Sequence, residues 1–208
     1  MVHRMETKCR IIPVVVLDDE ALAEPLAEAL CNAGLPAMEI TFRTHAAEAA
    51  IRRVAKNFPN VWLGAGTVLN AEQVRRAGGA GAAFLVSPGL NPATVAAARE
   101  AGLPIMPGVC TPTEVEAALA LGCGCLKFFP AEAAGGVKML KALAGPYSHT
   151  GVKFCPTGGI TAANMREYLA LPVVAAVGGS WMVEPALVKA RRFDEVERLA
   201  REAATILD

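Results

Sequence analysis

The chain has 208 residues, 53% of them hydrophobic, so it can bury one full-sized core, and we expect a single domain over residues 1–208. Its 20 basic and 20 acidic residues leave no net charge, which argues against nucleic acid as the main partner. Charged residues, glycines or prolines interrupt every long apolar stretch, so we expect no segment that spans a membrane.

The first eight residues carry ionisable side chains where a secretory signal would need an apolar run; these are His3, Arg4, Glu6 and Lys8. We therefore expect a cytoplasmic protein. The six cysteines include no C-x-x-C pair and mostly lie in apolar runs, which is typical of buried free thiols. The three histidines are widely spaced, so we expect no histidine metal site.

Short apolar runs of strand length alternate with longer alanine-rich stretches of helical length. The runs predict eight strands, at residues 10–17, 37–42, 61–67, 83–87, 104–109, 125–130, 152–157 and 173–178. Four helix starts are predicted by an Asn or Thr that can cap the first backbone N–H groups, and in two of them Pro follows, with φ already suited to the first turn. The four capping residues are Asn70, Asn91, Thr111 and Thr161.

Eight strands, each followed by a helix, predict an α/β fold of the (β/α)8 TIM-barrel type, although that fold typically has ~250 residues. The main alternative, an open doubly wound sheet, would need a G-x-G-x-x-G turn after the first strand. Residues 17–20 are instead Leu-Asp-Asp-Glu. We therefore favour the closed barrel, whose active site forms at the carboxyl ends of the strands.

Glu39 and Lys127 alternate with large apolar residues in their strands, so both are predicted to point into the barrel. Burial of Lys127 as an ammonium is costly, because desolvation favours the neutral amine, which is a nucleophile. The pattern also allows a structural ion pair between Lys127 and Glu39, or a Glu39–Arg43 pair instead of a general base. Lys153 begins its strand, and we assign it to the solvated rim at the other end.

Arg43 ends its strand, where a guanidinium can bind a carboxylate through two hydrogen bonds or simply be a cation near the next helix. Thr67 can hydrogen-bond a substrate or satisfy loop backbone. Glycine-rich turns close the last two strands, at residues 156–160 and 178–181. In TIM barrels these two loops often bind phosphate through backbone N–H groups; tight turns that need positive φ are the alternative.

Six segments are familiar as a set: Met-Glu-Ile-Thr-Phe-Arg-Thr at 38–44, Gly-Ala-Gly-Thr-Val at 64–68, Val-Ser-Pro-Gly at 86–89, Leu-Lys-Phe-Phe-Pro-Ala-Glu at 126–132, Pro-Thr-Gly-Gly-Ile at 156–160 and Gly-Gly-Ser-Trp-Met at 178–182. With them the chain resembles the bacterial 2-keto-3-deoxy-6-phosphogluconate (KDPG) aldolase family, which also includes 4-hydroxy-2-oxoglutarate (KHG) aldolase activity. The segments follow the family order. Cys110 departs from the small residue expected there, and the chain after Met182 matches less specifically.

The resemblance implies a class I aldolase, a lyase that cleaves KDPG to pyruvate and glyceraldehyde 3-phosphate in the Entner–Doudoroff pathway. It makes Lys127 the Schiff-base lysine and Glu39 the residue that transfers protons. The substrate-binding residues that it implies are Arg43, Thr67, Pro88, Phe129, Thr157, Gly158, Gly159, Gly179 and Ser180. It also implies a homotrimer, and the chemistry requires no metal or organic cofactor.

The residues leave other functions open. Within the aldolases, KHG, cleaved to pyruvate and glyoxylate, is the alternative main or second substrate. A phosphate-binding barrel isomerase or epimerase would use Glu39 as a base and Lys127 as an electrostatic stabiliser, with no covalent step. A sugar-phosphate-binding protein without catalysis would use only the glycine-rich loops.

Overall fold

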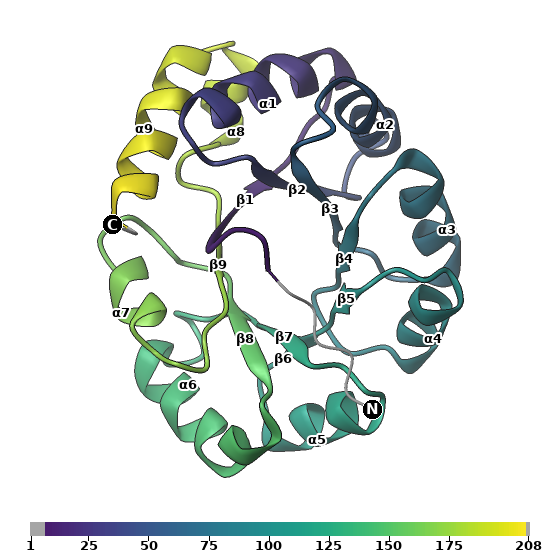
Figure 1. Cartoon of the computed structure of the whole chain (residues 1–208), viewed down its shortest axis with the longest axis vertical. Helices are drawn as coiled ribbons and strands as arrows, with labels where there is room; N and C mark the ends of the chain where they lie inside the picture. Colours follow the sequence, from purple (N-terminus) through teal and green to yellow (C-terminus); the bar gives the residue numbers. More distant parts are fainter. Residues whose placement is uncertain (1–6, 207–208) are drawn as a thin grey trace.

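The computed structural model describes residues 7–206 and has an α/β fold in which parallel strands curl around the centre and helices lie outside them (Figure 1). The expectation that the chain has no secretory signal rests partly on residues outside this range, namely His3, Arg4 and Glu6. Within residues 7–206, no helix combines the length and the apolar character needed to cross a bilayer.

The strands form two parallel sheets. They are β1 (Ile11–Val15), β2 (Ala37–Thr41), β3 (Trp62–Gly66), β4 (Phe84–Val86), β5 (Ile105–Met106), β6 (Gly108–Val109), β7 (Cys125–Phe128), β8 (Lys153–Pro156) and β9 (Val177–Gly179). One sheet has the order β5-β4-β3-β2-β1-β9 and the other has the order β6-β7-β8. Single bridges from Phe154 to Val174 and from Thr157 to Gly178 connect the β8 region to the β9 region.

The helices lie around the outside of these strands (Figure 1). They are α1 (Ala23–Asn32), α2 (Ala47–Asn57), α3 (Ala71–Ala80), α4 (Pro92–Glu100), α5 (Pro112–Ala120), α6 (Gly136–Ala144), α7 (Met165–Leu169), α8 (Pro185–Lys189) and α9 (Phe193–Thr205), with 3-10 turns at Glu20–Leu22 and Gly145–Thr150.

Six of the eight predicted strands are found with ends that differ by at most two residues, and two differ more. The fifth is divided into β5 and β6 at Pro107, which has no N–H to donate to a ladder but whose carbonyl accepts from the Lys127 N–H at 2.9 Å. The last regular strand begins only at Val177. Before it the chain contacts β8, where the Ala175 N–H donates to the Phe154 carbonyl, and it then changes partner to β1.

Three of the four predicted helix starts are confirmed. Asn70 and Asn91 accept from backbone N–H groups at the starts of α3 and α4, and Thr111 forms a capping box with Glu114 at α5. The fourth is wrong, because α7 begins later, at Met165. The side chain of Asn164 instead accepts from the Thr161 N–H at 2.8 Å.

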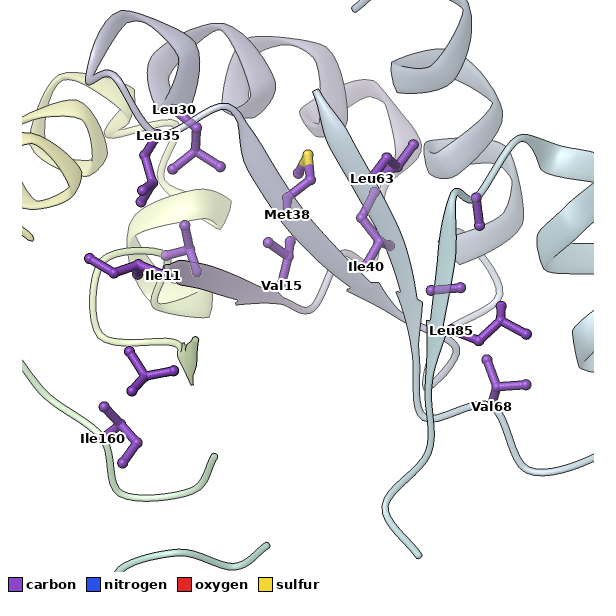
Figure 2. Packing of buried hydrophobic residues seen from close by; sticks show 14 of the residues in the cluster. Ile11, Val15, Leu30, Leu35, Met38, Ile40, Leu63, Val68, Leu85 and Ile160 are labelled. Carbon is purple, nitrogen blue, oxygen red and sulfur yellow. The ribbon is translucent and has the colours of Figure 1, made fainter. Parts of the chain in front are cut away.

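Alternation along the strands produces two hydrophobic clusters. The larger cluster lies between strands and helices, and Figure 2 shows Met38 and Leu63 on the helix-facing side of β2 and β3. The smaller cluster lies on the opposite faces of the strands and consists of Ile12, Ala37, Trp62, Phe84, Val86, Met106, Cys125, Cys155 and Ala176. In it the Trp62 and Phe84 rings stack with centroids 4.2 Å apart. All six cysteines are free thiols.

Candidate active site

Lys127 lies in β7 on the face opposite to Leu126 and Phe128, as predicted from alternation, and only 6% of it is exposed. Its strand is fixed between β6 and β8, where Lys127 is paired with Gly108 and Cys155. The amine nitrogen Nζ lies 5.0 Å from the centroid of the Phe129 ring. The half-buried aromatic face therefore contacts the amine and excludes part of the surrounding water.

Glu39 lies in β2 and is 3% exposed. Its carboxyl oxygen Oε1 is buried and has no hydrogen-bond partner among residues 7–206. Burial raises the pKa of this carboxyl above its ordinary value, while the positive charges of Lys127 and Arg43 act in the opposite direction. A carboxyl with a raised pKa is suited to exchanging protons near neutral pH.

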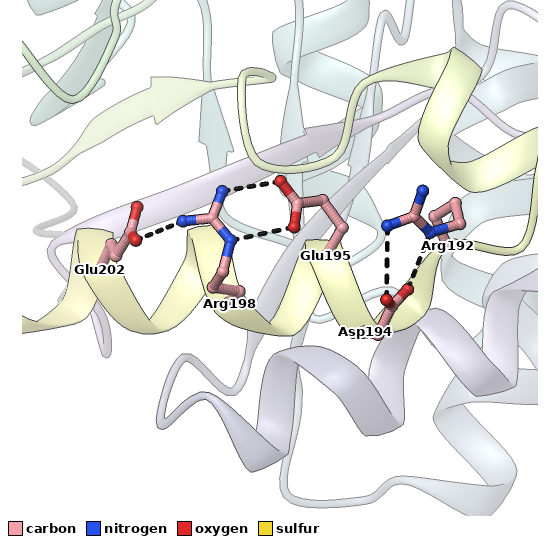
Figure 3. Close-up of polar contacts among 5 residues, drawn as sticks. All are labelled: Arg192, Asp194, Glu195, Arg198 and Glu202. Atoms are coloured by element: carbon pink, nitrogen blue, oxygen red, sulfur yellow. Dashed lines mark hydrogen bonds and ion pairs between the residues drawn. The ribbon is translucent and has the colours of Figure 1, made fainter.

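The structure does not support either structural ion pair considered for these residues. In the described part of the chain the ion pairs lie at the surface, and none includes Glu39, Arg43 or Lys127. Figure 3 shows such a surface group along α9, where Arg198 contacts both Glu195 and Glu202. Glu39 and Lys127 are therefore buried without neutralising each other directly. Lys153 is exposed at the other end of β8, as expected.

Arg43 follows β2 and is anchored by a residue to which the sequence alone assigned no role. Its Nε donates to Thr41 Oγ1 at 3.2 Å, and Thr41 Oγ1 in turn donates to the Val15 carbonyl at 2.9 Å. Thr41 is 1% exposed, so its hydrogen bond to β1 is buried, whereas Arg43 itself is exposed. The guanidinium terminal nitrogens have no partner within residues 7–206 and can bind an anion through two bonds.

Thr67 follows β3 in the left-handed region, with φ +55. A non-glycine residue in this region typically costs of order 1–3 kcal/mol, and such strain is often found at functional sites. Hydrogen bonds on both sides hold the turn: the Gly66 carbonyl accepts from Phe42 N–H at 2.8 Å, and Val68 N–H donates to the Val86 carbonyl at 3.1 Å. Within the described chain the Thr67 side chain makes no hydrogen bond, so the alternative that its hydroxyl bonds to the loop backbone is not supported.

Pro88 and Phe129 lie against glycines of neighbouring segments. A Cβ at Gly108 would be 2.0 Å from the Pro88 carbonyl oxygen, so the loop after β4 contacts the start of β6 directly. A Cβ at Gly158 would be 3.2 Å from the Phe129 ring. The Phe129 ring therefore contacts both the amine of Lys127 and the first glycine-rich loop.

The two glycine-rich loops lie side by side, because Thr157 forms a bridge with Gly178. A Cβ at Gly178 would be 2.5 Å from Thr157 Oγ1, so this glycine makes room for the buried threonine. Gly179 is paired with Pro13 of β1, and Ser180, the next residue, is exposed.

Gly158 and Gly159 have φ values of +97 and +80, so the need for positive φ is part of the reason for these glycines. Their carbonyls are occupied: Gly158 accepts from Glu132 N–H and Gly159 accepts from Asn164 Nδ2, both at 3.0 Å. In the part of the chain that the structure describes, the N–H groups of Gly158, Gly159 and Ile160 donate to no protein acceptor. A loop with occupied carbonyls and free N–H groups is suited to an anion.

Sequence reasoning assigned no role to Thr41, Gly66, Glu132, Asn164 and Tyr168. Thr41 gave a partial signal, since it shares a strand face with Glu39 and Arg43. The Tyr168 hydroxyl donates to the Glu132 carboxylate, which joins α7 to the segment after β7. This contact links residues 36 positions apart, and no local pattern indicates it.

Comparison with known proteins identifies the family. The profile of the family described as KDPG and KHG aldolase matches residues 2–199. A 2-dehydro-3-deoxy-phosphogluconate aldolase of Haemophilus influenzae is 49% identical over 198 residues, which cover 95% of this chain and 92% of that protein. A KHG/KDPG aldolase of Escherichia coli K12 is 47% identical over 193 residues, covering 93% and 90%.

A solved structure agrees with these relatives. The crystal structure of KDPG aldolase from Legionella pneumophila, with pyruvate captured at low pH as a covalent carbinolamine intermediate, matches with a TM-score of 0.89 and 41% identity, covering 93% of each chain. The family match, the relatives and the shared fold confirm what the six sequence segments indicated: the chain belongs to the KDPG and KHG aldolase family.

Proposed function

We propose that this chain is a class I aldolase that cleaves KDPG to pyruvate and glyceraldehyde 3-phosphate through a Schiff base on Lys127. The observation that carries the proposal is that Lys127 and Glu39 are both buried on the inner faces of strands, with no ion pair joining them in the described residues. The names of the relatives support the substrate, and the pyruvate carbinolamine of the Legionella enzyme supports a covalent step.

The Lys127 amine, once it has lost its proton, adds to the C2 carbonyl of the substrate, and loss of water from the carbinolamine forms an iminium. The iminium withdraws electrons from the C3–C4 bond. Glu39, through a water, accepts the C4 hydroxyl proton as that bond breaks and glyceraldehyde 3-phosphate leaves. Glu39 then returns a proton to C3 of the enamine, and hydrolysis of the iminium releases pyruvate and the free lysine.

The other expected residues bind the two ends of the substrate in this proposal. The free guanidinium nitrogens of Arg43 bind the carboxylate, with Thr67 beside them. The N–H groups at Gly158 and Gly159, together with Gly179 and Ser180, bind the phosphate. Between these ends, Pro88, Phe129 and Thr157 line the reacting carbons.

The proposal extends to architecture and assembly: one (β/α)8 barrel, a single domain, in a cytoplasmic homotrimer. Closure of the barrel is supported by the single residue between β5 and β6, by the bridges between the β8 and β9 regions, and by an inner cluster with residues from both sheets. Light scattering tests the assembly, with an expected mass of three times the 21.7 kDa chain.

Borohydride reduction in the presence of pyruvate tests the chemistry. We expect the mass of a reduced three-carbon acid on Lys127, located by peptide mass spectrometry, and none in Lys127→Met. Lys153→Met is the matched control, because Lys153 is an exposed lysine of the adjacent strand at the opposite end, and it should be labelled like the wild type. Unmodified wild-type protein would favour the isomerase or binding-protein interpretation.

KHG is the second substrate of this proposal, since the Escherichia coli relative is named for both activities. Its second carboxylate can use the anion-binding N–H groups that otherwise bind phosphate. We expect a higher kcat/KM for KDPG than for KHG, and the opposite order would reverse the choice of main substrate.

A further inference from the structure

We infer that Gly66 is a positioning residue for Glu39, because the missing side chain of Gly66 determines where the Glu39 carboxyl lies. The inference rests on the proposed function, in which Glu39 transfers protons. A Cβ at Gly66 would lie 2.0 Å from Glu39 Oε1, 2.7 Å from Cδ and 2.8 Å from Cγ. All three distances are far below a normal carbon contact, so an alanine at position 66 cannot coexist with this conformation of Glu39.

The backbone cannot easily move to relieve such a clash. β2 and β3 pair along their whole length, with Glu39 opposite Gly64 and Thr41 opposite Gly66, and every residue of both strands is buried. The Gly66 carbonyl also accepts from the Phe42 N–H at 2.8 Å. The overlap reaches Cγ, so rotation of the carboxyl group alone does not relieve it, and the whole Glu39 side chain has to change rotamer.

Gly64, two positions earlier on the same face of β3, shows what distinguishes Gly66. A Cβ at Gly64 would meet the Phe84 ring at 2.2 Å, so that glycine is required by aromatic packing. The three atoms nearest to a Cβ at Gly66 all belong to Glu39. The space beside Gly66 is therefore occupied by the buried Oε1 of Glu39, which has no hydrogen-bond partner in residues 7–206.

The test is a double-mutant cycle of Gly66→Ala and Glu39→Ala, with Gly79→Ala as a control because its Cβ would meet nothing within 4 Å. We expect Gly66→Ala to lower kcat by about 10²-fold or more, the usual contribution of an acid–base group, and to change the pH profile of kcat/KM. In the Glu39→Ala background the same substitution should lower kcat no further. Gly79→Ala should keep the wild-type kcat and pH profile.

Thermal unfolding of the four proteins of the cycle, which are the wild type, the two single variants and the double variant, keeps the inference testable if Gly66→Ala folds poorly. Gly66→Ala should lower Tm in the presence of Glu39 and much less in the Glu39→Ala background, since the clashing atoms are then absent. Equal losses of Tm or of kcat in both backgrounds, or wild-type turnover by Gly66→Ala, would overturn the inference. Borohydride trapping of pyruvate on Lys127 is measured in parallel. If the wild type is not labelled, the proposed function is refuted. Labelling of Gly66→Ala shows that its Lys127 amine is intact and that its loss of turnover arises elsewhere.

Discussion

Two influences act in opposite directions on the pKa of the Glu39 carboxyl. Burial raises this pKa, the positive charges of Lys127 and Arg43 lower it, and burial has the larger effect. The fold therefore favours the protonated form more than the unfolded chain does. The stabilisation linked to this protonation is complete below the ordinary pKa of about 4.5 and is lost as pH rises through the raised pKa of the folded protein.

This linkage predicts the pH dependence of Glu39→Gln, which is neutral at every pH. Relative to this variant, the wild type should lose stability as pH increases from about 4.5 through the raised pKa of the folded protein, because the wild type must then bury a charge or keep a proton. Tm measured for both proteins across this range checks the prediction. A difference in Tm that does not change with pH would show that the carboxyl titrates equally in the folded and unfolded chains.

We expect the substitution Thr41→Val to change substrate affinity rather than turnover. Thr41→Val removes the hydroxyl between the Val15 carbonyl and Arg43 Nε, so the guanidinium loses its orientation. Loss of one hydrogen bond, worth about 1 kcal/mol, corresponds to a roughly 5-fold increase in KM with kcat nearly unchanged.

Thr41→Ser should restore the wild-type KM, because it keeps the hydroxyl. Thr150→Val serves as the matched control: Thr150 Oγ1 donates to the Tyr147 carbonyl at 2.7 Å and accepts from the Val152 N–H at 3.2 Å, before β8 starts. This variant should keep the wild-type KM. A similar increase in KM for both valine variants would exclude a specific role of Thr41.

A site residue can be predicted from the sequence when its signal lies within one strand, and cannot be when its role depends on contacts between strands. Glu39 and Lys127 are visible from alternation alone, since a charge among apolar strand residues is a local pattern. The hydrogen bond from Thr41 to the Val15 carbonyl depends on which strands are neighbours, and the role proposed for Gly66 depends on the register of β2 against β3. Neither neighbour nor register is encoded within one segment.

Among the elements, the segment between β7 and α6 connects the lysine strand to the first glycine-rich loop. Ala131 N–H donates to the Thr157 carbonyl at 2.8 Å, and Glu132 N–H donates to that of Gly158 at 3.0 Å. The Glu132 side chain is held by the buried Tyr168 hydroxyl, and burial together with this carboxylate raises the pKa of the phenol. The tyrosine therefore orients a carboxylate close to the proposed phosphate loop.

Tyr168→Phe should weaken binding at that loop. Without the hydroxyl, the Glu132 carboxylate is no longer oriented, and it is free to repel a bound phosphate. We expect KM for KDPG to increase by roughly 5-fold, the equivalent of about 1 kcal/mol, while trapping of pyruvate on Lys127 is unaffected because pyruvate has no phosphate. An equal loss in both assays would instead indicate general damage to the fold.

The sequence predicts elements well where the signal is local. Asn70, Asn91 and Thr111 cap helices as expected, because a cap needs only its own first turn. Thr161 does not, since Asn164 bonds both to it and to the Gly159 carbonyl and thereby delays the helix. Pro107 divides a predicted strand, an effect that the apolar pattern obscures.

In the molecule as a whole, the inner cluster fills the space between the strands and extends from Ala37 and Trp62, at the starts of β2 and β3, to Val86 at the end of β4. The alternation of strands and helices predicts parallel pairing, but which strand follows β8 in space depends on the bridges formed by Val174 and Gly178. Such contacts join segments that are distant in sequence, and no local pattern indicates them.

Phe84→Ala should be strongly destabilising, because Phe84 is fully buried and stacked on Trp62. We expect the free energy of unfolding to fall by about 3–5 kcal/mol, as is usual for a large-to-alanine change in a core. Urea unfolding measures it, and Leu69→Ala, at an apolar side chain that is 49% exposed, should cost far less. Equal costs would mean that the stacked rings contribute little to stability.

The two thiols of the inner cluster make opening of the molecule chemically visible. Burial raises the pKa of the Cys125 thiol to about 12 and also raises that of Cys155, and alkylating reagents attack the thiolate. Both sulfurs should therefore resist a maleimide until the strands separate, and their rate of capture would then follow the native-state opening equilibrium. The alkylation rate of Cys125 and Cys155 would therefore report how often the native protein opens around its inner cluster.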